Sequence, residues 1–368
     1  MRNILATRAK QKSALNICYY TALSLCIAAK MFDISSLLNI PRELDLLMIV
    51  LSALFFSVKA IFSIKTRKQL LITAAMLALF LYIYFATGAT FVILSFLAAV
   101  SITEVNIKNI VKIDIALKAF FLAVHLGFFF MALLLFPAYL PATNSIGAYD
   151  LYFTNSNSAP ILALWLAIDI LYISAKPSFK KYLALFVLML ILFFIGKSRT
   201  AFFCFIIFSL LHLIKNEKIL TIMSRYAYLV SAGISFLIVN IVDKTSLYRT
   251  INTMFSSRLG YSIAAYRQTG LVLIPQPGDF NPFEKLIIDN FYVRCIVLYG
   301  IITLALYYIP IWLLNKRRAA EEKRISIVTS ISLFVEYVAC NVGFSIPFLI
   351  IASKALSEQN KKETKNGH

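Results

Sequence analysis

Charged residues are scarce in this sequence, and charge is what keeps most globular domains in solution. Only 14% of the 368 residues are Asp, Glu, Lys or Arg, against about 25% in an ordinary soluble domain. Apolar residues make up 60% of the chain, and the mean hydropathy is +0.81. This composition excludes an ordinary soluble domain and indicates an integral membrane protein.

Cysteine and histidine are also few, and their positions exclude several kinds of site. The five cysteines all lie in apolar runs without paired spacing, and the three histidines form no cluster with glutamate. We therefore expect neither a disulfide framework nor a metal site. The sequence also lacks an Asp-x-Asp pair for a cation-bound sugar nucleotide and a glycine-rich phosphate loop. No cofactor is expected.

Long apolar runs are what the sequence does contain. About 20 mostly apolar residues span the hydrocarbon core as a helix, and the runs are unbroken rather than alternating, which excludes a porin-like barrel. We expect an all-α polytopic membrane protein, a single transmembrane domain over 1–368 with about twelve transmembrane helices. The predicted spans are 14–32, 44–64, 69–87, 89–104, 115–136, 159–174, 182–196, 200–214, 227–242, 291–313, 326–340 and 345–357.

The distribution of lysine and arginine predicts the orientation in the membrane. If the amino terminus is cytoplasmic and the spans alternate, the cytoplasmic segments hold 24 of the 36 basic residues and the external segments hold 8. Cytoplasmic loops are enriched in Lys and Arg, so both termini are expected in the cytoplasm. The net charge of +19 then reflects topology, and we expect no nucleic-acid binding.

Two predicted external segments are longer than simple connections. The first, 137–158, is polar and aromatic and contains no Lys or Arg. The second, 243–290, has a length typical of functional or disordered loops, and its aromatic residues favour an ordered one. Its middle, SSRLGYSIAAYRQTGLVLI, is predicted to form an amphipathic helix on the outer membrane surface, and PQPGDFNP is predicted to form a turn.

Arginine on the external side requires a reason, because basic residues are expected inside. Arg199 stands at the external end of the connection between two spans. Arg249 and Arg258 lie in the large loop, and Arg294 lies just inside the next span. A guanidinium group stays charged and presents a planar fork of donors to phosphate oxygens. These arginines would suit a membrane-held diphosphate; the alternative for each is a carboxylate or a lipid headgroup.

Some ionisable residues stand within the predicted spans, and three of them bear on the argument. Lys118 lies near a cytoplasmic end, where a lysine can extend its amine to the membrane surface. Asp169 is expected to pair with a neighbouring helix. Glu336, in the middle of a span, is costly to bury unless it is paired or functional.

Five short motifs follow one another along the second half of the chain. They are SIGAYDLYFTNSNSAP, GKSRTAFF, SSRLGYSIAAY, IDNFYVRCIVLYGI and FVEYVACNVGFSIPFLI, and together they cover roughly residues 145–350. In this order, and with a large external loop, they resemble the O-antigen and capsule repeat-unit polymerases, often called Wzy, and more distantly the O-antigen ligases. Asn157 matches the family's Asn, whereas Ser156 stands where the family usually has proline.

The resemblance implies a GT-C-like helical bundle and a glycosyltransferase of the bacterial plasma membrane, active at its outer face. The donor would be a growing glycan on undecaprenyl diphosphate, and the acceptor would be one repeat unit on the same carrier. Arg199 and Arg258 are assigned to the diphosphate, and Asp289 is assigned as the base. The substrate-binding candidates are Arg249, Arg294, Asn157, Asn290 and Glu336. A flippase and a chain-length regulator are implied partners, besides membrane lipid.

Two other functions stay open, and so does a second interpretation of Asp289. A flippase that transports the lipid-linked oligosaccharide also has about twelve spans, although no repeat between the two halves is evident here. An O-antigen ligase would share the donor chemistry, and related ligases carry histidine where this chain has Asp289. Asp289 could instead be the N-cap of the following helix, a position where Asp and Asn are favoured.

Overall fold

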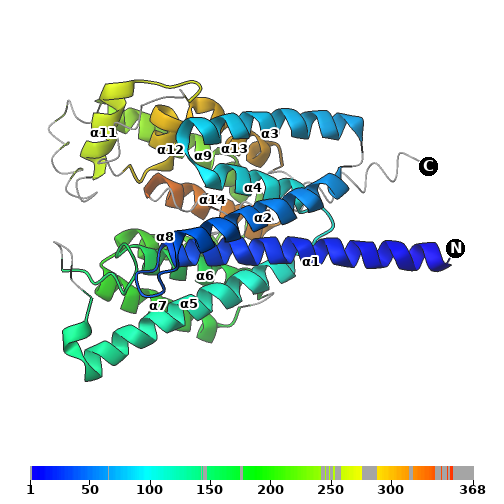
Figure 1. The fold of residues 1–368 in the computed structure, drawn as a ribbon. Coiled ribbons are helices and arrows are strands. Elements are labelled where there is room, and N and C mark those ends of the chain that lie inside the picture. The colour runs from blue at the N-terminus through cyan, green and yellow to red at the C-terminus, as the bar shows by residue number, and fades with distance from the viewer. Residues whose placement is uncertain are drawn as a thin grey trace. The chain divides into compact units, whose positions relative to one another are not determined.

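The computed structural model is helical wherever it describes regular structure. It describes residues 2–64, 66–141, 143, 147–174, 177–241, 245, 248, 252, 258–275, 288–314, 318–335, 341, 346 and 349–350. Within these ranges, the β contacts are two isolated bridges, Ser35 with Phe153 and Thr143 with Tyr149. Figure 1 shows the helices and their labels.

The chain divides into two compact units. Unit 1 comprises Met1–Leu70, Leu94–Leu211 and Val342–His368, and unit 2 comprises Leu71–Ile93 and His212–Asn341. The chain thus passes back and forth between the units, and neither is one continuous stretch of sequence. A single transmembrane domain over 1–368 stays a prediction.

Each unit is a bundle of helices. Unit 1 contains α1 (Arg2–Asp33), α2 (Arg42–Ser63), most of α4 (Thr90–Ser101), α5 (Ile107–Leu135), the 3-10 turn η1 (Pro137–Tyr139), α6 (Ser158–Ile173), α7 (Phe179–Gly196) and α8 (Arg199–Leu211). Unit 2 contains most of α3 (Arg67–Thr87), α9 (Glu217–Ile241), α11 (Arg258–Thr269), α12 (Phe291–Arg294), η3 (Cys295–Tyr299), α13 (Ile301–Leu314) and α14 (Ala320–Val335).

Six helices are long and apolar enough to cross a membrane. They are Gln11–Asp33, Arg42–Ser63, Gln69–Thr87, Ile107–Leu135, Phe179–Gly196 and Glu217–Ile241, and each coincides with a predicted span. Four more predicted spans correspond to the shorter apolar helices Thr90–Ser101, Ser158–Ile173, Arg199–Leu211 and Ile301–Leu313. The predicted spans 326–340 and 345–357 are described only in part. The architecture is compatible with a polytopic helical membrane protein, and the number of twelve spans stays a prediction.

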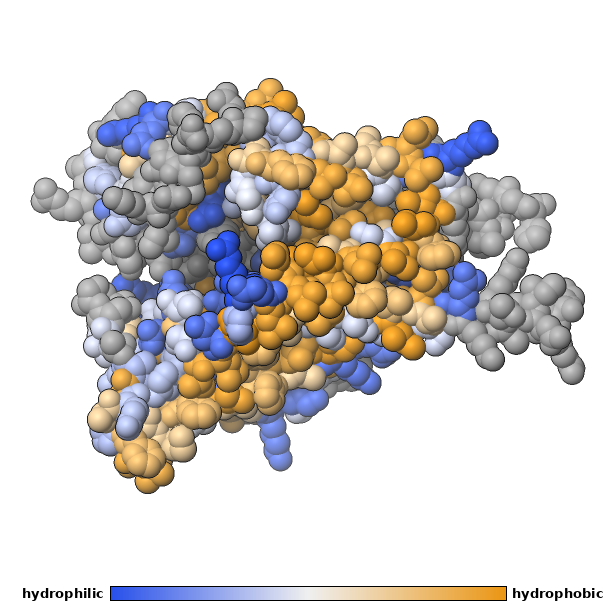
Figure 2. Space-filling view, viewed as in Figure 1, coloured by the Kyte–Doolittle hydropathy of each residue, from blue (hydrophilic) through white to orange (hydrophobic). Residues whose placement is uncertain are grey.

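Large apolar side chains remain on the outside of these helices. On α2, Leu46, Val50 and Leu54 are each more than half exposed, and on α3 Leu71 and Phe85 are more than two-thirds exposed. Figure 2 shows apolar side chains gathered over α2 and over α3. Exposed apolar surface of this extent marks contact with a partner or a membrane, and the helices that carry it have the length of membrane spans.

Polar caps define where several helices begin. Before α3, Gln69 N donates to Thr66 Oγ1 (3.1 Å) and Thr66 N donates to Gln69 Oε1 (3.3 Å), which is a capping box. The side chain of Asn106 caps α5, and Asn216 Oδ1 accepts from Lys218 N at the start of α9. These caps satisfy amide groups that the first helical turn leaves without an intrahelical partner.

A buried group of charges joins α5 to α6 in unit 1. Lys118 is fully buried, and its Nζ lies 2.5 Å from Asp114 Oδ2 and 3.2 Å from Asp169 Oδ2. The expectation that Lys118 reaches the membrane surface is therefore wrong, because an i, i+4 carboxylate on its own helix and a second one on α6 hold the amine inside. The expected pairing of Asp169 with a neighbouring helix is confirmed.

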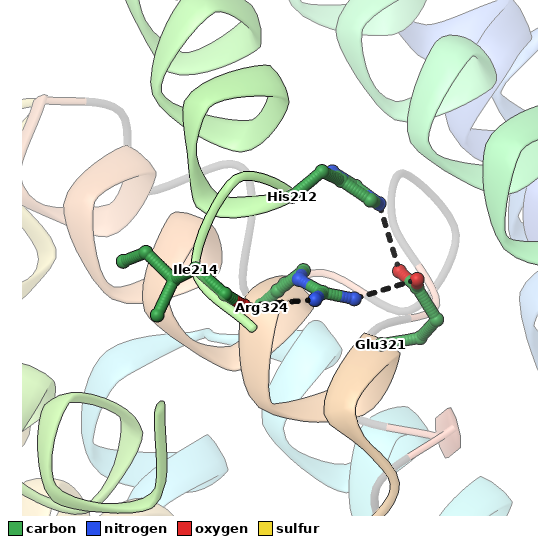
Figure 3. A network of polar contacts seen from close by, with 4 residues as sticks. All are labelled: His212, Ile214, Glu321 and Arg324. Carbon is green, nitrogen blue, oxygen red and sulfur yellow. Dashed lines mark hydrogen bonds and ion pairs between the residues drawn. The ribbon is translucent and has the colours of Figure 1, made fainter. Parts of the chain in front are cut away.

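A second polar group in unit 2 fixes the start of α14 to the turn before α9, and Figure 3 shows it. Glu321 Oε2 accepts a bond from His212 Nε2 (3.1 Å), while its Oε1 accepts from Arg324 Nη1 (2.7 Å). Arg324 also donates to the carbonyl of Ile214 (3.2 Å). Burial raises the pKa of Glu321, but the bonds and charges of His212 and Arg324 outweigh it, and the net effect is a lowered pKa.

We expect Glu321→Gln to lower thermal stability at neutral pH but not at acidic pH. A carboxyl with a depressed folded-state pKa contributes stability that is present above its unfolded value, about 4.3, and is lost as the pH falls through the folded pKa. The Glu321 side chain is 39% exposed, so the difference at pH 7 should be about 1 kcal/mol or less. Thermal unfolding of the purified chain between pH 7 and pH 3 measures it.

Glu217→Gln is the matched control, because Glu217 is an exposed glutamate in the first turn of α9. It should change stability less than Glu321→Gln at pH 7. If the two variants behaved alike at every pH, the Glu321 contacts would contribute nothing measurable.

Candidate functional site

The predicted span 291–313 is an interrupted helix in unit 2. A four-residue α-turn, α12, leads into the π-helical segment η3, and α13 begins after Gly300. Short π-helical segments occur frequently at functional sites. Interrupted helices at membrane depth are tolerated where other protein groups complete the backbone bonding. The groups that pair with the free backbone atoms of this interruption are therefore part of what stabilises it.

The chain that follows α11 completes the backbone bonding of the interruption. Val272 N donates to the carbonyl of Ile296 (2.8 Å), and Ile301 N donates to the carbonyl of Val272 (3.0 Å). Ile302 N donates to the carbonyl of Leu273 (3.3 Å). The segment after α11 therefore acts as a backbone partner for the broken span.

Gly300 makes this close approach possible. Its φ is +81°, and a Cβ at this position would lie 2.6 Å from the carbonyl oxygen of Leu273. Backbone at positive φ is readily adopted by glycine and strained for other residues. The interruption thus depends on the absence of a side chain at one position.

Asn290 caps the interrupted helix, and Asp289 precedes the cap. Asn290 Oδ1 accepts from Val293 N (3.0 Å), and Asn290 Nδ2 donates to Ser235 Oγ on α9 (3.0 Å). The interpretation of Asp289 as the N-cap is therefore wrong by one residue. Asp289 is only 7% exposed. A buried carboxyl group therefore lies just before the first turn of the interrupted helix. Because Asn290 is the cap, helix capping does not explain why Asp289 is there.

Arg294 folds back towards the residue before Asp289. Its Nε donates to the carbonyl of Ile288, and its Nη1 donates to Tyr299 Oη (3.1 Å). The ring of Tyr299 in turn packs edge-on against Phe91, with centroids 5.8 Å apart. Arg294 is thus held in one orientation across the turn that contains Asp289 and Asn290.

A chain of hydroxyl groups leads from Asn290 into the interior of unit 2. Ser235 Oγ donates to the carbonyl of Ser231 (2.8 Å), and Ser231 Oγ lies 3.0 Å from Ser330 Oγ on α14. Tyr292 Oη donates to the carbonyl of Ser330 (3.0 Å), and the Tyr292 side chain is fully buried. The sequence reasoning missed these residues, although the i, i+4 spacing of Ser231 and Ser235 in an apolar helix was an available signal.

The predicted helix in the large external segment exists as α11. It packs against α9 and η3, and its residues Leu259, Ile263 and Ala265 share one apolar cluster with Ile288 and Val293. One side of α11 therefore contacts protein.

Arg258 is the first residue of α11, directly before Leu259 of that apolar cluster. Its side chain lies outside the part of the chain that the structure describes. Arg249, Glu336 and the predicted turn PQPGDFNP, apart from its first residue Pro275, also lie outside that part.

In unit 1, the loop 137–158, which is predicted to be external, lies against the last turn of α7. Tyr149 N donates to the carbonyl of Ile195 (3.0 Å). A Cβ on Gly196 would lie 2.9 Å from the carbonyl oxygen of Ser156, so a side chain there would displace the loop. The structure thus brings together the two motifs that carry Asn157 and Arg199. Asn157 occupies the N-cap position of α6, and its carbonyl accepts from Ile161 N (3.1 Å).

Arg199 is exposed and begins α8. The preceding Lys197 ends α7 in a left-handed conformation with φ of 48°. Helix amino termini attract anions through their unpaired amides and the helix dipole. Two basic side chains at such a terminus would favour the binding of an anion at this turn.

The predicted site residues are thus distributed over both units. Asn157 and Arg199 belong to unit 1, whereas Arg258, Asp289, Asn290 and Arg294 belong to unit 2. No group of three or more metal-binding side chains occurs in the described residues.

The fold and the buried polar groups define a class of protein. It is a helical protein that has several apolar helices suited to a membrane, and polar side chains surround an interrupted helix. Comparison with protein-family models, with curated proteins and with solved structures finds no match for this chain.

We expect Gly300→Ala to destabilise unit 2. The positive φ alone should cost about 1–3 kcal/mol in a residue with a side chain, and the contact with Leu273 adds to that cost. Gly233→Ala on α9 is the matched control, because nothing lies within 4 Å of its Cβ position. Alanine there should be neutral or stabilising. Thermal unfolding of both purified variants measures the difference, and equal effects would show that the close approach at Gly300 is unimportant.

Proposed function

We propose that this chain is a membrane glycosyltransferase that joins oligosaccharide repeat units carried on undecaprenyl diphosphate, the reaction of the repeat-unit polymerases that its motifs resemble. In this proposal the protein lies in a bacterial plasma membrane with both termini in the cytoplasm. The observation that carries the proposal is the buried Asp289 at the mouth of an interrupted helix whose cap is already supplied by Asn290.

The reaction requires a group that accepts the acceptor's hydroxyl proton. As the acceptor oxygen bonds to the anomeric carbon of the donor sugar, the bond from that carbon to the phosphate oxygen breaks and undecaprenyl diphosphate leaves. A carboxylate in a buried, weakly hydrated position is suited to take the proton. Asp289 is assigned this role, and the contacts of Arg294 with Ile288 and Tyr299 support the turn that orients it.

The leaving diphosphate requires positive charge. Arg199, at the amino terminus of α8, is assigned to phosphate oxygens in unit 1, and Arg258, at the start of α11, is assigned to phosphate oxygens in unit 2. Fixed donors aimed at developing negative charge stabilise a leaving group without a metal. Arg249, Asn157 and Glu336 stay proposed substrate contacts.

A lipid-linked oligosaccharide flippase is the second candidate. Two observations favour it, the interrupted helix and the buried Asp114, Lys118 and Asp169 in unit 1. Discontinuous helices and ionisable groups at membrane depth are typical of transporters. The polymerase ranks first because the flippase does not account for Asp289 or for the arginines at the external ends of the helices.

The first test is deletion of the gene in its own host, followed by gel analysis of the surface glycan and the lipid-linked intermediates. A polymerase deletion should reduce a ladder of repeats to a single repeat unit that still reaches the surface. Loss of all surface glycan with single units accumulating on the inner leaflet would identify a flippase. Full-length polymer retained on its lipid carrier would identify a ligase.

We expect Asp289→Asn to leave the protein folded and to lower polymer formation by at least about 10²-fold, the lower limit for loss of a general base. The amount of polymer restored in the deletion strain, at equal protein level, measures it. Asp33→Asn is the matched control, because Asp33 is an exposed aspartate at the end of α1. Full activity of Asp289→Asn would remove Asp289 from the mechanism.

We expect Arg199→Ala and Arg258→Ala each to reduce polymer yield, and Arg267→Ala to have little effect. Arg267 is an exposed arginine in the last turn of α11, the opposite end from Arg258. The same complementation assay compares the three at equal protein level. An equal loss in all three would indicate a general effect of charge and contradict the assignment to phosphate.

A further inference from the structure

The buried charges on α5 and α6 are not used by the proposed transfer reaction. Asp114 and Lys118 are 0% exposed and Asp169 is 1% exposed. Both carboxyl groups bond to the same Lys118 nitrogen, at 2.5 Å and 3.2 Å. Figure 1 shows that α5 and α6, which carry them, lie side by side. We refer to these three residues as the buried triad.

The charges of the buried triad do not balance. Two ionised carboxylates and one ammonium leave one excess negative charge, and an uncompensated charge removed from water is costly. Asp114 Oδ1 is buried and has no hydrogen-bond partner within the described residues. This oxygen is where one further positive group would be accepted.

Within the described residues, Lys118 is the basic side chain that pairs with Asp114 and Asp169, and the other lysines of α5, Lys108 and Lys112, are exposed. The helices that pack on α5 and α6 are α1, α7 and α8, with η1 at the end of α5. The titratable and basic side chains described on them are Lys12, Cys18, Tyr19, Tyr20, Cys26, Lys30, Asp33, Tyr139, Lys180, Lys181, Tyr182, Arg199 and Cys204. The ion pairs of Lys12 and Lys30 within the described residues are with Glu104 and Asp33.

His125 is the next titratable group along α5, about 10 Å from Lys118 at 1.5 Å per residue. Its Nδ1 bonds to the carbonyl of Phe121 (2.7 Å), so that nitrogen carries a hydrogen. Its Nε2 then accepts from Ser35 Oγ (2.9 Å). This arrangement is complete with a neutral imidazole, which adds no charge to the buried triad.

We propose that Asp114, Lys118 and Asp169 form a binding site for one proton inside unit 1. The Lys118 ammonium already occupies the place between the carboxylates that a metal cation would take, so the remaining ligand is a proton on one of the two carboxyls. With the proton bound the site is neutral, and after its release the site carries one negative charge. Ionisable groups of this kind within membrane helices are typical of proton relays.

The number of bound protons should change with each substitution in a defined way. The wild-type protein should hold one proton at the buried triad, whereas Asp114→Asn and Asp169→Asn should hold none, because one carboxylate then balances the ammonium. Infrared spectra of the purified full chain in lipid vesicles measure this, through the carbonyl band of protonated carboxyl groups and its shift in heavy water. The wild-type-minus-variant difference should contain that band for both Asn variants.

Asp33→Asn is the matched control and should give no such band in its difference spectrum, because Asp33 is 56% exposed. Both Asn variants keep a balanced charge and are therefore expected to fold. Two results would overturn the proposal. The first is a protonated-carboxyl band unchanged in both Asn variants. The second is a thermal stability that rises with sodium in the wild type but not in Asp114→Asn, which would identify a metal cation in place of the proton.

Discussion

Every peptide group inside a membrane must be paired by the protein itself, because lipid offers no hydrogen bonds. Long helices such as α2 and α5 meet this requirement internally, and their apolar side chains can then face outward. The interruption at Gly300 cannot meet it alone. Val272 and Leu273 supply the missing partners, and they can do so only because Gly300 has no side chain. The position of α11 follows from the same requirement, because the segment that completes the broken span leads directly out of α11.

The polar groups around Asn290 in unit 2 and around Lys118 in unit 1 are both buried, but they are compensated in different ways. In unit 2, Asn290, Ser235, Ser231 and Ser330 pair neutral donors with neutral acceptors, so no charge needs compensation. Asp289 is the residue before Asn290, the member of this network that caps the interrupted helix. In unit 1 the groups around Lys118 are charged, and neutrality there depends on protonation. A fully paired neutral network makes the surrounding helices rigid, whereas a network of ionisable groups can change its protonation state.

The sequence predicts the existence of helices here better than their interruptions. Runs of about 20 apolar residues were sufficient to predict the six long helices, and the pattern after Arg258 was sufficient for α11. The break at Gly300 was missed because CIVLYGIITL is apolar on both sides of the glycine. Hydropathy depends on side chains and does not show where the backbone hydrogen bonding of a helix is interrupted.

The wrong predictions for Asp289 and Lys118 also have physical causes. Asp289 and Asn290 are both good N-cap residues, and only the geometry shows that the second one forms the cap. Lys118 was expected at the membrane surface because its distance from the helix end allowed it. Its partner Asp114 stands four residues earlier, so the pair was present in the sequence, but the burial of both depends on α6.

The alternation of the chain between the two units affects the order in which the protein is made. Most of α3 belongs to unit 2, but the rest of that unit begins only at His212. At about 5–20 residues per second of synthesis, α3 waits roughly 6–25 s for the helices with which it forms that unit. Only 11% of its apolar span becomes buried inside the protein. An apolar helix of this length that stays largely exposed after folding is suited to remain in a bilayer during this wait.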